Sequence, residues 1–178
     1  MSKVSVATFG AGCFWCTEAC FDALKGVIKV VPGFSGGQKE SPSYEDVCRG
    51  NTGHAEVAQI TFDIELISFE ELLKVFWFIH DPTQLDRQGH DIGSHYRSVI
   101  FYHSEAQENS SRALKNELTA QGVWDKPIVT ELSSFDCFYP AENYHKDYLR
   151  LNPENIYCQA VVRPKVDKFK AVFAELLK

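Results

Sequence analysis

The sequence lacks any hydrophobic run that approaches the ~20 residues needed to cross a membrane. It also lacks an N-terminal apolar segment of the kind that directs secretion, so we expect a cytoplasmic protein without a membrane partner. Basic residues are in the minority, since 18 Lys and Arg against 24 Asp and Glu give a formal net charge of −6. That balance suits a nucleic-acid phosphate backbone poorly, and we expect no nucleic-acid partner.

Internal repeats, linkers and low-complexity segments are also missing. The 178 residues, 44% hydrophobic and 24% charged, predict one globular domain over residues 1–178, which we expect to be monomeric. Apolar runs and amphipathic segments follow a β-α-β-β-α-β order with extra helices, which favours an α/β domain with helices packed on a mixed sheet. The expected strands are 5–9, 27–31, 55–63, 97–103, 127–132 and 159–162, and the expected helices are 13–25, 68–80, 104–121, 141–149 and 164–177.

Cysteine is present six times, which is unusual for a chain without an export signal. In a reducing compartment such residues indicate metal binding, redox chemistry or simple burial. On the helix expected over 13–25, Cys16 and Cys20 fall on the buried face, whereas Thr17 and Glu18 fall on the opposite face. We interpret Cys20 as a core thiol. The remaining cysteines are Cys13, Cys48, Cys137 and Cys158, of which Cys48 and Cys137 have no ligand partner at metal-binding spacing and are interpreted as structural.

Cys13 stands in a glycine-rich turn between an expected strand and an expected helix, in the segment Gly10-Ala11-Gly12-Cys13-Phe14-Trp15. Unpaired backbone N–H groups and the positive end of the helix dipole favour a thiolate at such a helix start. A lowered pKa would make Cys13 a nucleophile at neutral pH, and Phe14 and Trp15 place aromatic surface beside it. The alternative, a buried structural cysteine, is less consistent with so specific a context.

Glu56 lies in the run Ala55–Asp63, where polar and apolar residues alternate as in a half-buried strand. Its side chain shares a face with Ala58, Ile60 and Phe62 and therefore points to the apolar side. Removal from water disfavours the charged form and raises the pKa, which makes Glu56 a candidate general acid. The spacing alone leaves it equally open that Glu56 lies at a frayed strand end and reaches water.

The polar stretch of residues 81–96 has the length of a functional loop. It carries His90, His95 and Asp91, but the spacing of the two histidines has no matching ligand set elsewhere, so we expect no metal. Tyr44, in an earlier loop, is by itself only a tyrosine that covers apolar surface.

Several short motifs occur in a fixed order between residue 10 and about residue 158, nearly the whole chain. They are Gly12-Cys13-Phe14-Trp15, Gly33-Phe34-Ser35-Gly36-Gly37, Pro42-Ser43-Tyr44-Glu45-Asp46-Val47-Cys48, Gly53-His54-Ala55-Glu56, His80-Asp81-Pro82-Thr83-Gln84, Asp91-Ile92-Gly93-Ser94-His95-Tyr96-Arg97-Ser98 and Phe138-Tyr139-Pro140-Ala141-Glu142. Together they are very specific, and the chain resembles the A-type peptide methionine sulfoxide reductases. The resemblance implies a ferredoxin-like two-layer α/β sandwich with extra terminal elements, and no cofactor.

The resemblance also implies a role for each matching residue. Cys13 matches the nucleophile that attacks the sulfoxide sulfur, and Glu56 matches the acid that protonates the sulfoxide oxygen. Phe14 and Trp15 match the apolar pocket for the substrate's methyl group. The polar side of the pocket is implied for three further residues: Tyr44, Tyr96 and Asp91.

The implied reaction reduces methionine-S-sulfoxide, free or in proteins, and so repairs oxidised proteins. Attack by the Cys13 thiolate releases methionine and leaves a sulfenic acid on Cys13. A second thiol then forms a disulfide with Cys13, which a thioredoxin-type partner reduces. The family acts on the S epimer because its pocket holds methyl group, oxygen and chain in one handedness.

The second thiol is left open by the sequence, because the chain departs from the family pattern. Cys16 stands where the family often has glycine. In a helical turn its Cα would lie about 5–6 Å from the Cα of Cys13, which is within disulfide range. Cys16 is also expected on the buried face of the helix, where it would be a core thiol. Cys158 matches the family's first recycling cysteine, but a run that resembles a strand, 159–162, follows it instead of a glycine-rich tail. We favour Cys158 slightly on the positional match.

Two other classes of function match part of the sequence. Cys13-Phe14-Trp15-Cys16 is a CxxC motif at a helix start, which would suit a thioredoxin-like dithiol-disulfide oxidoreductase. That alternative leaves Glu56 and the tyrosines without a role. A non-enzymatic metal- or peptide-binding module would need further Cys or His pairs at ligand spacing, which the sequence does not show.

Overall fold

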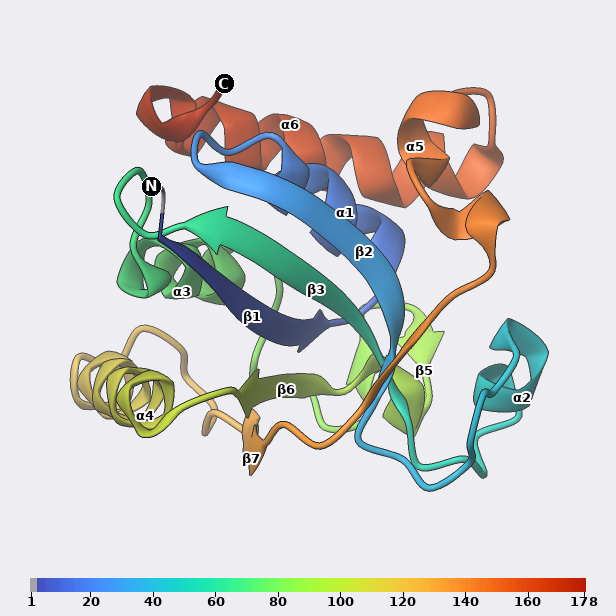
Figure 1. Cartoon of the computed structure of the whole chain (residues 1–178), viewed down its shortest axis with the longest axis horizontal. Helices are drawn as coiled ribbons and strands as arrows, with labels where there is room; N and C mark the ends of the chain where they lie inside the picture. The colour runs from blue at the N-terminus through green and yellow to red at the C-terminus, as the bar shows by residue number, and fades with distance from the viewer. Residues whose placement is uncertain (1–2) are drawn as a thin grey trace.

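A six-stranded sheet forms the centre of the computed structural model, which describes residues 3–178 (Figure 1). The strand order is β7-β6-β1-β3-β2-β8, in which β6 and β7 pair in parallel and all other neighbours pair antiparallel. The strands are β1 (Val4–Ala11), β2 (Val27–Ser35), β3 (Ala55–Asp63), β6 (Ser98–Tyr102), β7 (Glu131–Ser134) and β8 (Phe138–Pro140), and a separate hairpin pairs β4 (Arg87–Gln88) with β5 (Asp91–Ile92).

The helices are α1 (Phe14–Asp22), α2 (Tyr44–Cys48), α3 (Phe69–Phe78), α4 (Glu105–Ala120), α5 (Tyr148–Leu151) and α6 (Arg163–Val172), with short 3₁₀ turns at Ser94–Tyr96, Asn143–His145 and Ala174–Leu176. The inner strands β6-β1-β3-β2, with α1 and α3 in their crossovers, form the β-α-β-β-α-β unit of a ferredoxin-like sandwich. The expected fold class is therefore confirmed. None of the helices within residues 3–178 has the length and apolar character needed to span a bilayer.

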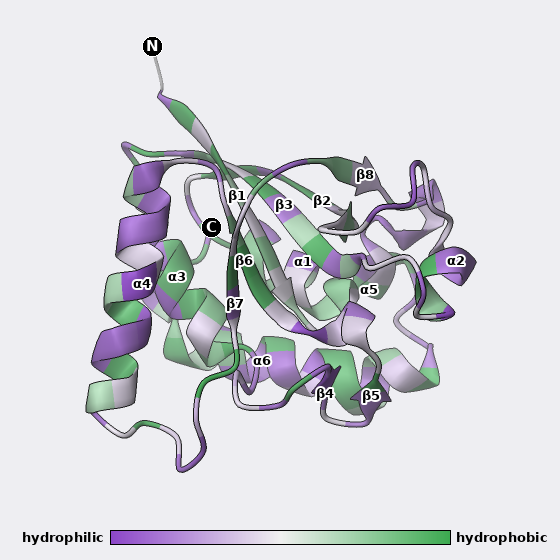
Figure 2. Ribbon diagram, turned by 90° about the horizontal axis from the view of Figure 1, so that it is seen from below, coloured by the Kyte–Doolittle hydropathy of each residue, from purple (hydrophilic) through white to green (hydrophobic). Residues whose placement is uncertain are grey.

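The main core lies between one face of the sheet and the helices α1, α3 and α6. Phe9 from β1 contributes to this core with Ile60 from β3, Phe21 from α1 and Phe76 from α3, and all four side chains are fully buried. A smaller cluster on the opposite face includes Val57 and is partly covered by aromatic residues around β8. Helix α4 is largely hydrophilic and lies at the edge of the molecule (Figure 2).

Local sequence signals placed several elements correctly. β3 spans the predicted residues 55–63. Ser68 caps α3, which falls within the predicted helix 68–80, with a capping box: its hydroxyl accepts from the Glu71 N–H at 3.1 Å and its own N–H donates to the Glu71 carboxylate at 2.8 Å. Gly122 follows the end of α4 with a φ of +63°, the left-handed conformation that glycine allows.

The strand predicted over 159–162 is wrong. This stretch is a turn of π-helix, Cys158–Val162, that continues directly into α6. Cys158, Val162, Val166 and Phe169 are all buried, and their spacing of three or four residues is that of a helix face. The apolar stripe therefore extends the terminal helix backwards across Pro164, and the turn that precedes this proline is π-helical.

Other boundaries also differ. β2 continues through Pro32 and Gly33 to Ser35, and it pairs with β8, which was not predicted. The segment around Tyr44, which we expected to be a loop, contains α2, and Ser43 caps this helix through the N–H of Asp46. The helix expected over 141–149 is broken into two short turns, because Asp147 adopts a left-handed φ of +53° between them.

Candidate active site

Cys13 lies where β1 turns into α1. Gly12 makes this turn with a φ of +88°, and a Cβ at Gly12 would lie 2.8 Å from Cγ of Gln88, so the position requires glycine on both counts. Cys13 is the N-cap residue of α1, and its carbonyl oxygen accepts from the Cys16 N–H at 3.2 Å. The side chain is 8% exposed. The predicted placement of Cys13 at a helix N-terminus is therefore confirmed.

The predicted lowering of the Cys13 pKa is wrong for this structure. Burial raises the pKa of the thiol well above its ordinary value, and the neighbouring Cys16 thiol, within hydrogen-bonding range, raises it further. The Trp15 N–H and the Tyr157 hydroxyl act in the opposite direction and lower this pKa. The increase in the Cys13 pKa caused by burial is larger than the decrease expected from the helix N-terminus. Formation of the thiolate therefore depends on the polar groups around the sulfur and on the substrate that enters.

Glu56 occupies the buried face of β3, as the strand parity predicts, and is 1% exposed. One carboxylate oxygen accepts from the Phe14 N–H at 3.2 Å, in the first turn of α1. The other oxygen, Oε2, is buried and has no hydrogen-bond partner among the described residues. Burial raises the pKa of Glu56 well above its ordinary value, and the charges of Cys13 and Asp91 raise it further. The frayed-edge alternative is thereby excluded, because Glu56 is buried beside the thiol and not exposed to water.

Tyr44, Tyr96 and Asp91 come from three different segments and meet around Glu56. Burial raises the pKa of both tyrosines, and the charge of Glu56 is the next cause for each. Asp91 accepts a hydrogen bond from the Tyr157 hydroxyl. The structure therefore brings together the polar residues that the family motifs predict, and it adds Tyr157, whose hydroxyl lowers the pKa of the Cys13 thiol.

Aromatic side chains form the apolar wall of the site. The Phe14 ring is buried 5.7 Å from the ring of Phe34 and 6.1 Å from that of Tyr44. Trp15 stacks on Tyr148 with ring centroids 3.7 Å apart and an interplanar angle of 4°. The indole Nε1 donates to Nδ1 of His145 at 3.1 Å.

His145, Tyr148 and Tyr157 were not predicted as site residues. His145 lies 130 residues from Trp15, and no local pattern connects them. The same segment covers the outer face of α1, because the Asp147 N–H donates to the Glu18 carboxylate at 2.9 Å. Glu18 and Thr17 are therefore buried, contrary to the solvent-facing position predicted for them. A signal for Tyr157 did exist, since it stands beside the motif residue Cys158.

Two further thiols surround Cys13. Cys16 is buried and lies within hydrogen-bonding range of the Cys13 thiol. Cys158 is fully buried, and the charge of Cys13, after burial itself, raises its pKa. All six cysteines are free thiols. Both candidate resolving thiols are thus near the nucleophile, whereas Cys20 is a core thiol whose pKa burial raises to about 12.

One group of side chains within residues 3–178 has the geometry of a metal site. It consists of Cys48, Glu56 and His95, whose potential ligand atoms lie within 4.8 Å of one another. The combination of His90, His95 and Asp91 considered from the sequence does not form such a group among the described residues.

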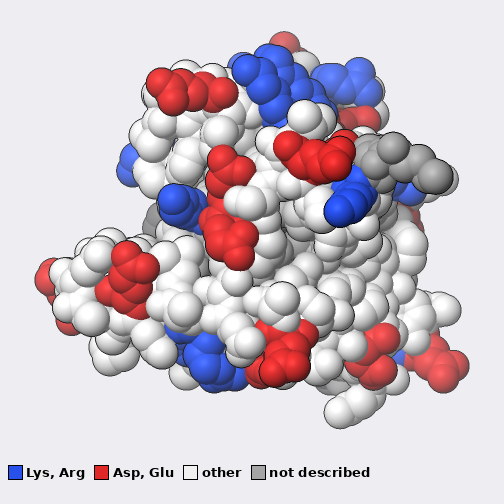
Figure 3. Space-filling view, turned by 60° about the vertical axis from the view of Figure 1, so that its left-hand side comes forward, with Lys and Arg blue, Asp and Glu red and all other residues white. Residues whose placement is uncertain are grey.

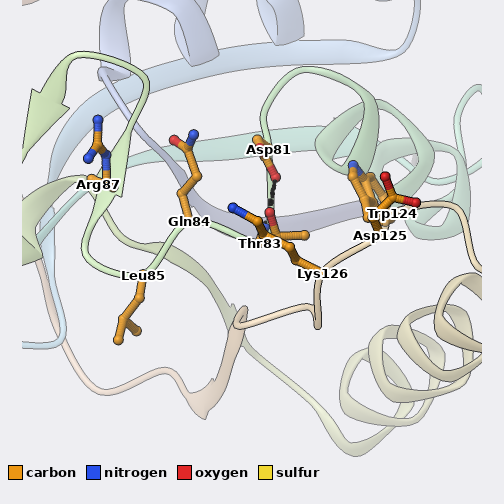
Figure 4. A pocket seen from close by; sticks show the side chains of 8 residues that line it. All are labelled: Asp81, Thr83, Gln84, Leu85, Arg87, Trp124, Asp125 and Lys126. Carbon is orange, nitrogen blue, oxygen red and sulfur yellow. Dashed lines mark hydrogen bonds between the residues drawn. The ribbon is translucent and has the colours of Figure 1, made fainter.

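A cavity of about 490 Å³ lies apart from the sulfur chemistry (Figure 4). Its lining combines the start of the 81–96 loop with Trp124, Asp125 and Lys126, and the Thr83 hydroxyl donates to the Asp81 carboxylate at 2.6 Å. None of the predicted catalytic residues lines it. Acidic and basic side chains are interspersed on the face shown in Figure 3.

Comparison with known proteins connects this geometry with a chemistry. The family model described as peptide methionine sulfoxide reductase matches residues 5–177. The peptide methionine sulfoxide reductase MsrA of Saccharolobus solfataricus is 50% identical over 175 residues, covering 98% of both chains. That of Thermus thermophilus is 48% identical over 173 residues, covering 97% of both chains.

Solved structures show the same similarity in three dimensions. Reduced Mxr1 from Saccharomyces cerevisiae superposes with a TM-score of 0.82 at 36% identity, covering 88% of this chain and 90% of that one. A structure of Mxr1 in complex with Trx2 superposes with a TM-score of 0.58 at 26% identity, covering 82% and 85% of the two chains.

Proposed function

This chain belongs to the peptide methionine sulfoxide reductase family and reduces methionine sulfoxide, and we propose that Cys13 is its nucleophile and Glu56 its proton donor. The observation that carries the assignment is the Glu56 carboxyl group, which is buried, bonded through one oxygen to the first turn of α1 and unpartnered at Oε2. Burial raises its pKa, which favours the protonated form that a general acid requires.

In the reductive step the Cys13 sulfur attacks the sulfoxide sulfur while Glu56 delivers a proton to the sulfoxide oxygen. The oxygen then passes to the Cys13 sulfur: a new bond between Cys13 Sγ and oxygen forms while the substrate S–O bond and the transient S–S bond break. Methionine leaves as the thioether, and Cys13 is left as a sulfenic acid. The sulfoxide sulfur gains two electrons and the cysteine sulfur loses two. Tyr44 and Tyr96, which both lie near Glu56, hydrogen-bond the sulfoxide oxygen, and Asp91 fixes the polar side of the pocket through Tyr157.

Phe14 and Trp15 hold the methyl group of the substrate on the opposite, apolar side. An aromatic wall on one side and hydrogen-bond donors on the other distinguish the methyl group from the oxygen of a chiral sulfoxide. We propose that this arrangement selects the S epimer, because in the R epimer these two groups would exchange places.

The sulfenic acid on Cys13 condenses with the thiol of Cys158 or Cys16, which releases water and forms a disulfide. A thioredoxin-type dithiol then restores the free thiols. The structure of Mxr1 bound to Trx2, a thioredoxin, supports a partner of this class. The thioredoxin-like alternative based on Cys13 and Cys16 is superseded, since the strand order is ferredoxin-like and the family match covers residues 5–177.

We propose further that residues 1–178 act as one catalytic domain, as a monomer and in the cytoplasm. The proposed site is assembled from β1, α1, α2 and β3 and from segments around residues 91–96 and 145–158 of one chain. Six free thiols suit a reducing compartment. Sedimentation equilibrium of the reduced protein measures the mass, and a dimer would contradict the proposal.

The test of the proposed chemistry is Cys13→Ser assayed on separate R and S epimers of a methionine sulfoxide peptide. A serine hydroxyl is far less nucleophilic than a thiol at neutral pH, so turnover should be lost. Cys137→Ser is the matched control, because Cys137 lies outside the site and its carbonyl, which accepts from Ser35, is retained. Activity in Cys13→Ser, or equal rates on the two epimers in the unmodified enzyme, would contradict the proposal.

A further inference from the structure

His95 is buried beside the active site without a hydrogen-bonding role. It is 4% exposed, and neither Nδ1 nor Nε2 has a partner among the described residues. Glu56 Oε2 is likewise buried and unpartnered. Buried polar atoms are nearly always paired, so an imidazole and a carboxylate oxygen left open at the same place indicate a ligand that both can bind.

Cys48, at the C-terminal end of α2, supplies a thiol to the same place. Its Sγ, a carboxylate oxygen of Glu56 and a ring nitrogen of His95 lie within 4.8 Å of one another. Cys48 is free and exposed, so this corner of the site is open to solvent. Burial raises the pKa of the Cys48 thiol, and the neighbouring Tyr44 hydroxyl acts in the opposite direction.

We propose that Cys48, Glu56 and His95 form a binding site for a divalent cation of the zinc class. Thiolate sulfur, imidazole nitrogen and carboxylate oxygen are the three ligand types that zinc takes in proteins, and three protein ligands leave a fourth position open. Bond lengths of 2.0–2.3 Å place tetrahedral ligands about 3.6 Å apart, so the group closes by about 1 Å on binding. Cys48 can supply most of that movement because it is on the surface.

The bound cation would inhibit sulfoxide reduction, a consequence that rests on the proposed role of Glu56. A carboxylate that ligates a cation cannot carry the proton that the sulfoxide oxygen needs. The cation would also lie beside Tyr44 and Tyr96, where the substrate oxygen is proposed to bind. The enzyme would therefore work when this class of metal is scarce and stop reversibly when it is abundant.

The three thiols around the nucleophile are the competing metal site. Cys13, Cys16 and Cys158 are buried close together, and thiolates bind the same class of metal. Among residues 3–178, however, they do not form a group with all ligand atoms within 4.8 Å, whereas Cys48, Glu56 and His95 do. The test therefore uses substitutions that remove ligands from one group and leave the other group intact.

The probe is Co²⁺, added to the fully reduced protein without oxygen, because a thiolate ligand gives a charge-transfer band and tetrahedral coordination gives intense visible bands. Zn²⁺ affinity follows from displacement of Co²⁺. Cys48→Ser and His95→Gln should each weaken binding by about tenfold or more, since each removes a ligand of three. Cys137→Ser and the pair Cys16→Ser with Cys158→Ser should leave it unchanged.

Two results would overturn the site: no thiolate–cobalt band in the unmodified protein, or a band that survives Cys48→Ser and disappears with the Cys16 and Cys158 substitutions. Cys48→Ser keeps the test valid should the buried His95→Gln variant fail to fold. Sulfoxide reduction is then measured with and without Zn²⁺, each variant against its own metal-free rate. Binding at Cys48 without inhibition would leave the metal site standing and refute the role of Glu56.

Discussion

The backbone N–H of Phe14 donates to the side chain of Glu56 across 3.2 Å, and so joins the first turn of α1 to β3 over a separation of 42 residues. The bond holds one carboxyl oxygen next to the residue that follows the nucleophile. The other oxygen stays unpartnered among the described residues. The acid and the thiol are therefore oriented by the same helix start before any substrate enters.

Glu56→Gln should keep this bond and remove the proton. The amide oxygen can still accept from the Phe14 N–H, but a primary amide cannot act as the acid, and the loss of a general acid costs about 10²–10⁴-fold in rate. The loss should appear in single-turnover formation of methionine. Cys13 should still be alkylated by iodoacetamide, which needs no proton donor.

The control for this variant is Glu45→Gln, an exposed carboxylate on α2 whose removal leaves the buried acid in place. It should reduce sulfoxide at the rate of the unmodified enzyme. A Glu56→Gln enzyme with that same rate would reassign the proton to Tyr44, Tyr96 or water.

The resolving thiol can be identified by mapping the disulfide that forms after one equivalent of methionine sulfoxide. We expect a Cys13–Cys158 bridge, because Cys158 has the family position and is close enough for the charge of Cys13 to raise its pKa. Digestion without reductant, followed by mass measurement, identifies the linked peptides. A Cys13–Cys16 peptide would show that the thiol already in contact resolves, and a persistent sulfenic acid would exclude both.

Tyr157→Phe should make Cys13 harder to ionise. The Tyr157 hydroxyl lowers the pKa of the Cys13 thiol, so the variant should have a higher Cys13 pKa than the unmodified protein. The pH profile of iodoacetamide alkylation, followed on the Cys13 peptide, should shift to higher pH. Tyr144→Phe, an exposed tyrosine away from the sulfur, serves as the control and should leave the profile in place. An unshifted profile in Tyr157→Phe would mean that this hydroxyl bonds to Asp91 and has no effect on the Cys13 pKa.

Glu18 makes stability depend on pH in an unusual direction. Burial raises its pKa from 4.5 to about 7, so between these values the folded state retains a proton that the unfolded chain has lost. The contribution of Glu18 to stability is full below pH 4.5 and is lost as the pH rises through 7. Glu18→Gln keeps an acceptor for the Asp147 N–H, and it should raise the free energy of unfolding by about 3 kcal/mol at pH 8.5.

Urea denaturation at pH 5 and pH 8.5 measures this difference. At pH 5 the variant and the unmodified protein should differ little, because the folded state then carries neutral Glu18. The exposed Glu117→Gln on α4 should show no pH-dependent change. A Glu18→Gln protein that is less stable at pH 8.5 would show that the ionised carboxylate stabilises the fold.

The sequence by itself determined the elements whose signals are local. The alternation through Ala55–Asp63 is a property of neighbouring residues, and it placed Glu56 on the buried face of β3. Ser68 and Glu71 form their capping box within four residues, and glycine before Cys13 marks the turn into α1. The order of the motifs was sufficient to recognise the family, because this recognition depends on residue identity and not on contacts.

Only the tertiary structure decided what surrounds these residues. The pKa of Cys13 is raised and not lowered, because burial depends on every element packed around the thiol. Residues 158–162 are helical, because their apolar side chains extend the buried stripe of α6. Trp15 meets His145 and Glu56 meets His95 across separations that leave no periodic trace in the sequence. The site combines local elements, but its electrostatics arise from contacts between distant segments, and these exist only once the sheet has formed.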